Sequence, residues 1–144
     1  MLHVLLICAS LAVLATIAVQ DMRTLKISNA ALAVVTGFAI AVVLTRPDLA
    51  LGLDAATGFG MLALGLIYWS RGWMGGGDAK LFLPVGLLVG QGGVMVFALG
   101  LLGAGTVMYL LVRKREGWAE TGVPFAVPVF FAALAGSLAG LATT

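Results

Sequence analysis

Long apolar runs separated by short polar segments make up almost the whole chain. About 18–20 apolar residues cross a bilayer as a helix. Irregular backbone exposed to lipid is not tolerated at membrane depth, so each run is predicted to be helical. We therefore expect one all-α transmembrane domain over residues 1–144, a bundle of six spans. The spans lie approximately at residues 2–19, 29–44, 53–69, 79–89, 94–112 and 123–141.

The fourth run is short, and only the QGG segment at residues 91–93 separates it from the fifth. The basic residues distinguish six spans from five. With six spans, seven Lys and Arg residues fall on one side and Arg46 alone on the other, whereas merging the two runs makes the count four against four. The positive-inside rule favours six spans, with both termini outside the cytoplasm. The cytoplasmic residues are then Arg23, Lys26, Arg71, Lys80, Arg113, Lys114 and Arg115.

Composition agrees with a membrane protein. The chain is 62% hydrophobic and 10% charged, whereas a soluble domain is about half apolar and about a quarter charged. The 20 glycines suit close approach between membrane helices. The net charge is +2, and the basic residues lie in short loops. They therefore indicate the orientation of the chain in the membrane and not a nucleic-acid partner. The single cysteine, Cys8, allows neither an internal disulfide nor a multi-cysteine zinc site, and no cofactor or metal is expected.

Six acidic residues are present, and four of them are expected to be solvated loop charges. Asp48 and Asp54 are assigned to the external loop after the second run, and Glu116 and Glu120 to the loop after the basic RKR cluster. Asp21 and Asp78 differ, because each adjoins an apolar run at its predicted cytoplasmic end. An acid near membrane depth is costly and usually faces a bundle interior or a water-filled cavity with a functional role.

Two carboxylates a few ångströms apart cannot both ionise easily, so the pair shares a proton. An aspartic protease uses this state, because the ionised member takes a proton from water and the protonated member donates to the carbonyl oxygen. A structural alternative stays open at this point. Asp78 is a favoured residue for capping the fourth helix, and Asp21 has Arg23 and Lys26 nearby for ion pairing.

Three glycines, Gly75, Gly76 and Gly77, run directly into Asp78. Glycine lacks a side chain and readily adopts positive φ, so the triplet leaves room for another backbone, such as an extended peptide substrate. A flexible turn before a helix is the alternative interpretation.

Three segments resemble motifs of one known family. Residues 75–81, GGGDAKL, are similar to its GxGDxKL signature. Residues 21–29, DMRTLKISN, resemble its D-x-R-x-x-x-I-P-N segment, with Ser28 where proline is usual. Residues 123–126, VPFA, resemble its VPF-type segment. Together they make nearly the whole chain similar to the type IV prepilin peptidases, which are bacterial membrane aspartyl proteases.

The resemblance implies that Asp21 and Asp78 are the catalytic dyad. Gly75, Gly76 and Gly77 would shape the loop or bind substrate beside Asp78. Lys80 either biases the charge of the dyad or anchors its helix at the membrane interface, and both roles stay open.

The implied substrate is a type IV prepilin. Its short basic leader is cleaved off after a glycine next to the pilin's hydrophobic helix, at the cytoplasmic face of the inner membrane. Long family members carry an insert, often with CxxC motifs, that is linked to N-methylation. Here only residues 20–28 occupy that place, so the chain resembles the short branch associated with Flp-type (tight-adherence) pili. The glycine content suggests that a substrate helix enters laterally between helices.

Two other functions compete with the protease: a small ion or proton transporter subunit, and a non-catalytic subunit of pilus or secretion assembly. Leader cleavage distinguishes them. The protease interpretation predicts that Asp21→Asn and Asp78→Asn each abolish cleavage, while Asp48→Asn and Asp54→Asn do not.

Overall fold

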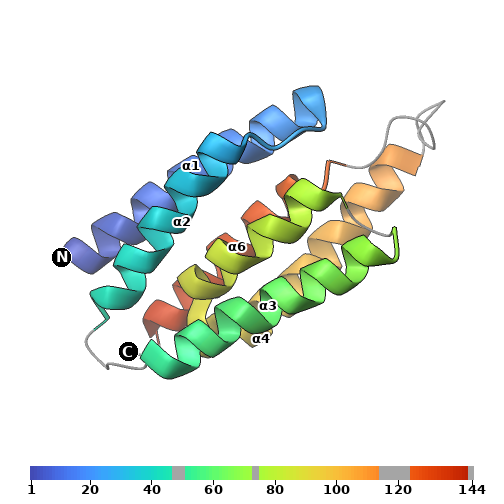
Figure 1. Cartoon of the computed structure of the whole chain (residues 1–144). Coiled ribbons are helices and arrows are strands. Elements are labelled where there is room, and N and C mark those ends of the chain that lie inside the picture. Colours follow the sequence, from blue (N-terminus) through green and yellow to red (C-terminus); the bar gives the residue numbers. More distant parts are fainter. Residues whose placement is uncertain (47–50, 73–74, 114–123, 143–144) are drawn as a thin grey trace.

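The structure is a computed structural model that describes residues 1–46, 51–72, 75–113 and 124–142. Within these ranges the only regular structure is helical, which confirms the predicted all-α fold. Helix α1 and two segments, Leu51–Ser70 and Gly76–Leu111, are long and apolar enough to cross a membrane. The helices are α1 (Leu2–Thr24), α2 (Asn29–Leu44), α3 (Leu51–Ser70), α4 (Gly76–Arg113) and α6 (Ala126–Ala142) (Figure 1).

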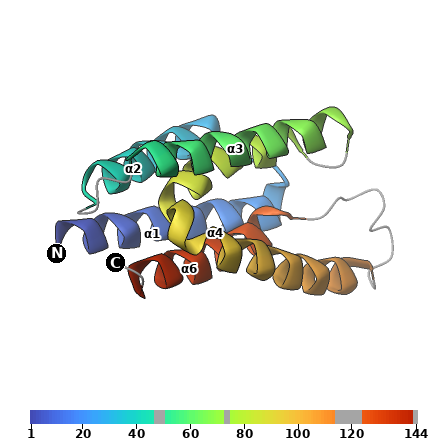
Figure 2. The same ribbon diagram turned by 90° about the horizontal axis from the view of Figure 1, so that it is seen from below.

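The fourth and fifth predicted runs both lie in α4, which consists of two helices joined at a kink. Each of the six predicted runs thus contains a helix in the described structure, while their crossing of a membrane as six spans stays a prediction. The predicted break at residues 91–93 adjoins the kink. Gly90 has φ 63° and ψ −174°, outside the helical region. Figures 1 and 2 show the chain folding back here. The first half of α4 is residues 76–89, and the second half is residues 91–113.

The first half of α4 lies at the centre of the bundle. Between Leu81 and Val89 every residue except Leu83 is buried, so this stretch is apolar all round, as expected of a core helix. Helix α4 packs against α6, α3 and α2, while α1 packs against α2 and α6 (Figure 2). The buried apolar side chains of this half include Leu81, Phe82, Val85, Leu87, Leu88 and Val89.

Glycines bring α3 and the first half of α4 into close contact. A Cβ added to Gly86 would lie 2.8 Å from the Cα of Gly58, and one on Gly65 would lie 2.8 Å from the carbonyl oxygen of Ala79. Real Cβ atoms do not approach other atoms this closely. Small residues therefore set the separation of these two helices, as expected for a membrane bundle.

A buried ion pair joins the end of α2 to the start of α3, and it corrects one prediction. Asp54 was expected to be a solvated loop acid, but it lies in the first turn of α3 and is 1% exposed. Its Oδ2 lies 2.6 Å from Nη1 of Arg46. The prediction failed because the position next to an external loop looks the same in sequence whether the side chain points out or in. Asp48, Glu116 and Glu120 lie outside the described residues.

The same ion pair holds the fold-back of α4. Arg46 donates from Nη2 to the carbonyl oxygen of Leu88 at 2.8 Å, and the backbone N–H of Gln91 donates to Oδ1 of Asp54 at 3.2 Å. A Cβ on Gly90 would collide with the guanidinium and lie 2.6 Å from the Asp54 carboxylate. The glycine therefore supplies both the positive φ and the space that this turn needs.

Both chain termini lie at one end of the bundle (Figure 1). The opposite end gathers the last turns of α1 and α3, the start of α2, both ends of α4 and the start of α6. Asp21 and Asp78 belong to this opposite end.

Candidate active site

Asp21 is held in place by the start of α6. It lies in the last turn of α1, and its side chain is 4% exposed. The backbone N–H of Ala126, the first residue of α6, donates to its Oδ2 at 3.0 Å. The first N–H groups of a helix have no partner within the helix, and the helix dipole makes that end positive. The first turn of α6 is therefore a suitable place for a carboxylate.

Asp78 lies in the first turn of α4, three residues after Gly75. The carbonyl oxygen of Gly75 accepts from the N–H of Ala79 at 3.1 Å, so Gly75 is the residue that caps this helix. A hydrogen bond also links the Gly75 N–H to the Asp78 carboxylate. This is one half of a capping box, in which an acid three positions into the helix reaches back to the cap residue.

That capping contact leaves part of the Asp78 carboxylate unused. Its Oδ1 is buried and has no hydrogen-bond partner among the described residues. A purely structural cap has no need for a second buried oxygen without a partner, since burial of an unpaired polar atom is unfavourable. The capping alternative therefore accounts for only one of the two oxygens.

The structure brings Asp21 and Asp78 into one cavity of about 360 Å³. The two carboxylates are close enough to interact electrostatically. They come from opposite ends of helices that run in opposite directions, so their meeting requires the antiparallel bundle. The other residues around this dyad cavity are Leu25, Lys26, Ile27, Asn29, Gly75, Gly76, Gly77 and Lys80.

The glycine triplet allows close packing and does not form an unusual bend. Gly76 and Gly77 belong to α4, and the positive-φ glycines of the described chain are Gly72 and Gly90. A Cβ on Gly77 would lie 3.2 Å from the Cβ of Ile27, and one on Gly76 would lie 3.3 Å from Nε1 of Trp69. The triplet thus lets the start of α4 approach the segment that follows Asp21.

Lys80 and Lys26 are the cations that border the dyad cavity. Both side chains are exposed, so each lies at the rim of the site and not between the carboxylates. This position is compatible with either role considered for Lys80.

One part of the site gave no signal in the sequence. The donor to Asp21 is the backbone of Ala126, and a backbone N–H has no residue type that marks it. Only the motif position of residues 123–126 pointed to this segment, and residue 123 itself lies outside the described ranges. In the described part of the chain, no group of three or more His, Cys, Asp or Glu side chains is arranged to hold a metal ion.

A comparison with protein-family models finds a match over residues 8–141 to the type IV leader peptidase family. Neither the curated proteins nor the solved structures that were searched gave a significant match. The matched region includes all of α2, α3 and α4, most of α1 and α6, and both aspartates of the cavity.

Proposed function

The chain belongs to the type IV leader peptidase family, and from this premise we propose that it is an aspartic endopeptidase whose catalytic dyad is Asp21 and Asp78. Its substrate is a type IV, Flp-like prepilin, from which it removes the basic leader after a glycine next to the hydrophobic helix. The observation that carries the proposal is the meeting of the buried Asp21 and the partly buried Asp78 in one cavity.

The two carboxylates have different surroundings, and these support different roles. Asp21 accepts a hydrogen bond at the positive end of α6, which favours the ionised carboxylate. Asp78 has a buried oxygen without a partner among the described residues, and burial without a partner favours the neutral acid. Asp21 is thus the base of the dyad, and Asp78 is the acid.

Hydrolysis then follows the usual two-carboxylate scheme. Asp21 removes a proton from a water molecule whose oxygen attacks the scissile carbonyl carbon, while Asp78 gives its proton to the carbonyl oxygen. In the second step Asp21 gives its new proton to the leaving amine as the C–N bond breaks. Asp78 recovers a proton from one hydroxyl of the intermediate, and the dyad returns to its starting state.

We assign the dyad to the cytoplasmic face of the inner membrane. The residues that flank its end of the bundle include Arg23, Lys26, Arg71 and Lys80. Arg46, the one basic residue predicted on the other side, is neutralised by Asp54. By the positive-inside rule, which counts Lys and Arg, the basic residues at the dyad end of the bundle support this orientation. A prepilin leader is basic and cytoplasmic, so it would meet the dyad on this side.

We further propose that the chain lacks N-methyltransferase activity. Only residues 25–28 connect α1 to α2, the place where long family members carry the insert linked to methylation. Mass spectrometry of the cleaved pilin would show an unmodified N-terminal residue. A methylated product formed by this chain alone would contradict the assignment.

Co-expression with a Flp-type prepilin tests the protease itself, with leader removal followed on a gel. Asp21→Asn and Asp78→Asn keep the shape of each side chain and leave an amide oxygen to accept the Ala126 or Gly75 N–H. We expect each to lower the cleavage rate at least about 100-fold, because general acid–base catalysis contributes about 10²–10⁴. Asp48→Asn is the matched acid control and should cleave normally. Cleavage persisting in both dyad variants, or Asp-dependent ion flux without pilin, would contradict the proposal.

A further inference from the structure

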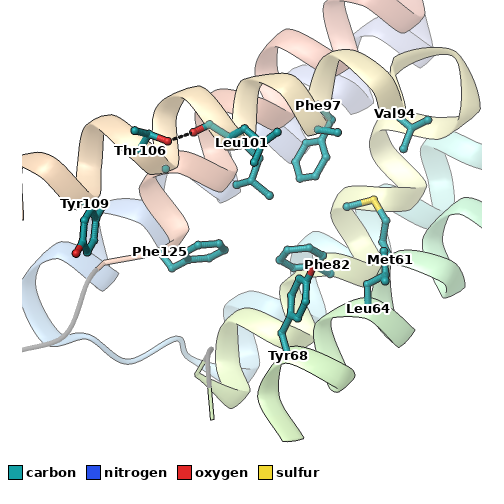
Figure 3. A pocket seen from close by; sticks show the side chains of 13 residues that line it. Met61, Leu64, Tyr68, Phe82, Val94, Phe97, Leu101, Thr106, Tyr109 and Phe125 are labelled. Carbon is teal, nitrogen blue, oxygen red and sulfur yellow. Dashed lines mark hydrogen bonds between the residues drawn. The ribbon is translucent and has the colours of Figure 1, made fainter. Parts of the chain in front are cut away.

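A second cavity, larger and almost wholly apolar, opens between α3 and the two halves of α4 (Figure 3). Its volume is about 730 Å³. We call it the apolar groove. It shares no lining residue with the dyad cavity. Its walls are Met61, Leu64 and Tyr68 on α3, and Val94, Phe97, Ala98, Leu101, Leu102, Gly105, Thr106 and Tyr109 on α4, with Phe82 and Phe125 between them.

The floor of the groove is aromatic and buried, and its rims are exposed. Phe82 and Phe97 pack edge to face with ring centroids 6.4 Å apart, and both are buried. Leu64 and Leu102, on opposite rims, are 51% and 70% exposed. A groove with a buried aromatic floor and accessible apolar rims suits the side chains along one face of an incoming apolar helix.

One end of the groove adjoins the dyad. Phe82 lies one helical turn beyond Asp78, and Phe125 directly precedes Ala126, which holds Asp21. Figure 3 shows Tyr109 and Phe125 toward one end of the groove, and Val94 and Met61 toward the other. The groove therefore runs from the level of the dyad toward the middle of the bundle.

Polarity changes along the groove in the same direction. The hydroxyl-bearing residues Tyr68, Thr106 and Tyr109 line the end nearer the dyad, while the far end is lined by Met61, Val94 and Phe97. A polypeptide that is polar at its start and apolar thereafter matches this order. At a rise of 1.5 Å per residue, the wall from Val94 to Tyr109 is about 22 Å long. This length spans most of the hydrocarbon core of a bilayer, which is about 30 Å thick.

We infer that the apolar groove receives the hydrophobic helix of the prepilin, with the start of that helix at the tyrosine end and the cleaved bond at the dyad. This inference rests on the proposed function and goes beyond it by naming the surface that selects the substrate. The groove opens sideways between α3 and the second half of α4, so the pilin helix enters from the lipid without leaving the bilayer. Association of apolar helices in lipid depends on close packing, which small wall residues permit.

Gly105 provides a clean way to block the groove. A Cβ added at Gly105 would meet nothing within 4 Å, so a larger side chain there starts in open space beside the groove that Gly105 lines. Gly103, on the same helix, is also free of contacts within 4 Å and does not line the groove. Gly103→Leu is therefore a matched control for Gly105→Leu.

Cleavage should be measured with two substrates, a full-length prepilin in vesicles and a soluble peptide that carries the leader, the cleaved bond and only the first few residues after it. We expect Gly105→Leu to lower kcat/KM for the prepilin at least about tenfold, since an extra side chain in a packed contact is costly. It should leave the peptide rate unchanged, and Gly103→Leu should alter neither. Equal prepilin rates in the two variants, or an equal loss on both substrates, would overturn the inference.

Photocrosslinking supplies a readout that does not depend on cleavage. A photoreactive residue at position 105 of the Asp78→Asn variant should form an adduct with the prepilin helix, and one at position 103 should not. Adducts with lipid alone at position 105 would overturn the groove assignment. A prepilin adduct at 105 combined with no cleavage by the parent chain would instead support the groove and contradict the proposed function.

Discussion

Asp54→Asn tests the ion pair that clamps the fold-back of α4. The substitution keeps the size of the side chain and leaves an oxygen to accept the N–H of Gln91. It removes the charge that faces the Arg46 guanidinium, whose nitrogen lies 2.6 Å from the carboxylate. The result is a largely buried cation that keeps its hydrogen bond to the carbonyl oxygen of Leu88.

The expected cost follows from how deeply the pair is buried. Breaking a buried ion pair by removing one partner costs about 3–5 kcal/mol. The side chains of Arg46 and Asp54 are 12% and 2% exposed, so water reaches part of the guanidinium and the lower end applies. We expect the free energy of unfolding to fall by about 3 kcal/mol, a change of more than about 100-fold in the folding equilibrium.

The measurement is denaturant unfolding of the purified protein in detergent micelles, followed by its helical circular dichroism. A double-mutant cycle with Arg46→Gln isolates the pair, because residues in direct contact show interaction energies of about 0.5–3 kcal/mol. The ion pair lies at the end of the bundle remote from the dyad, so the folded fraction of Asp54→Asn should cleave prepilin at the parent rate.

The opposite result is equally clear. A solvated surface acid can be replaced with a change of no more than about 0.5 kcal/mol. A change of that size for Asp54→Asn, or additive effects in the double-mutant cycle, would show that Asp54 is the loop charge first expected from the sequence.

Three further predictions concern the fold-back and the dyad. Gly90→Ala should lower the free energy of unfolding by at least about 1–3 kcal/mol in the same assay, because it strains a positive-φ residue and pushes Cβ into Arg46; an unchanged stability would contradict this. Ala126→Pro removes the N–H that donates a hydrogen bond to Asp21, while proline is well tolerated at the first position of a helix. Loss of this charged hydrogen bond, worth about 1.5–3 kcal/mol, should lower kcat/KM about 10- to 150-fold, whereas Ala126→Gly, which keeps the donor, should not. The cleavage rate should also depend on pH along a bell-shaped curve, because acid protonates Asp21 and removes the base, while alkali ionises Asp78 and removes the acid. A cleavage rate that stays constant across both limbs of the curve would refute the shared-proton dyad.

Much of the architecture was predictable because the bilayer allows few solutions. Any long apolar run must be helical, so the all-α fold followed directly from the pattern. The same rule, combined with the asymmetry of the basic residues, put Asp21 and Asp78 at one end of the bundle. The break near residues 91–93 was also visible as glycines, and the structure has a kink at the neighbouring Gly90 that divides α4 into two helices.

The roles of individual glycines and acids were harder to predict from the sequence. The triplet before Asp78 suggested conformational freedom, but Gly76 and Gly77 lie in a regular helical turn, and Gly77 makes room for Ile27. The position of Asp54 in the sequence suggested a solvated loop charge, but its side chain is buried against Arg46. In each case the residue type allowed two environments, and the choice depended on a neighbour distant in sequence.

The sequence by itself determined which segments are helical and which end of the bundle carries the two aspartates, because both depend on the local balance of apolar and charged residues. Only the tertiary structure decided that both carboxylates line one cavity, that Asp21 is held by the first N–H of α6, and that an apolar groove runs toward them along α4. These features arise from contacts between helices far apart in the chain. Hydrophobic pattern drives each helix into the membrane, but packing between helices determines which polar atoms meet there.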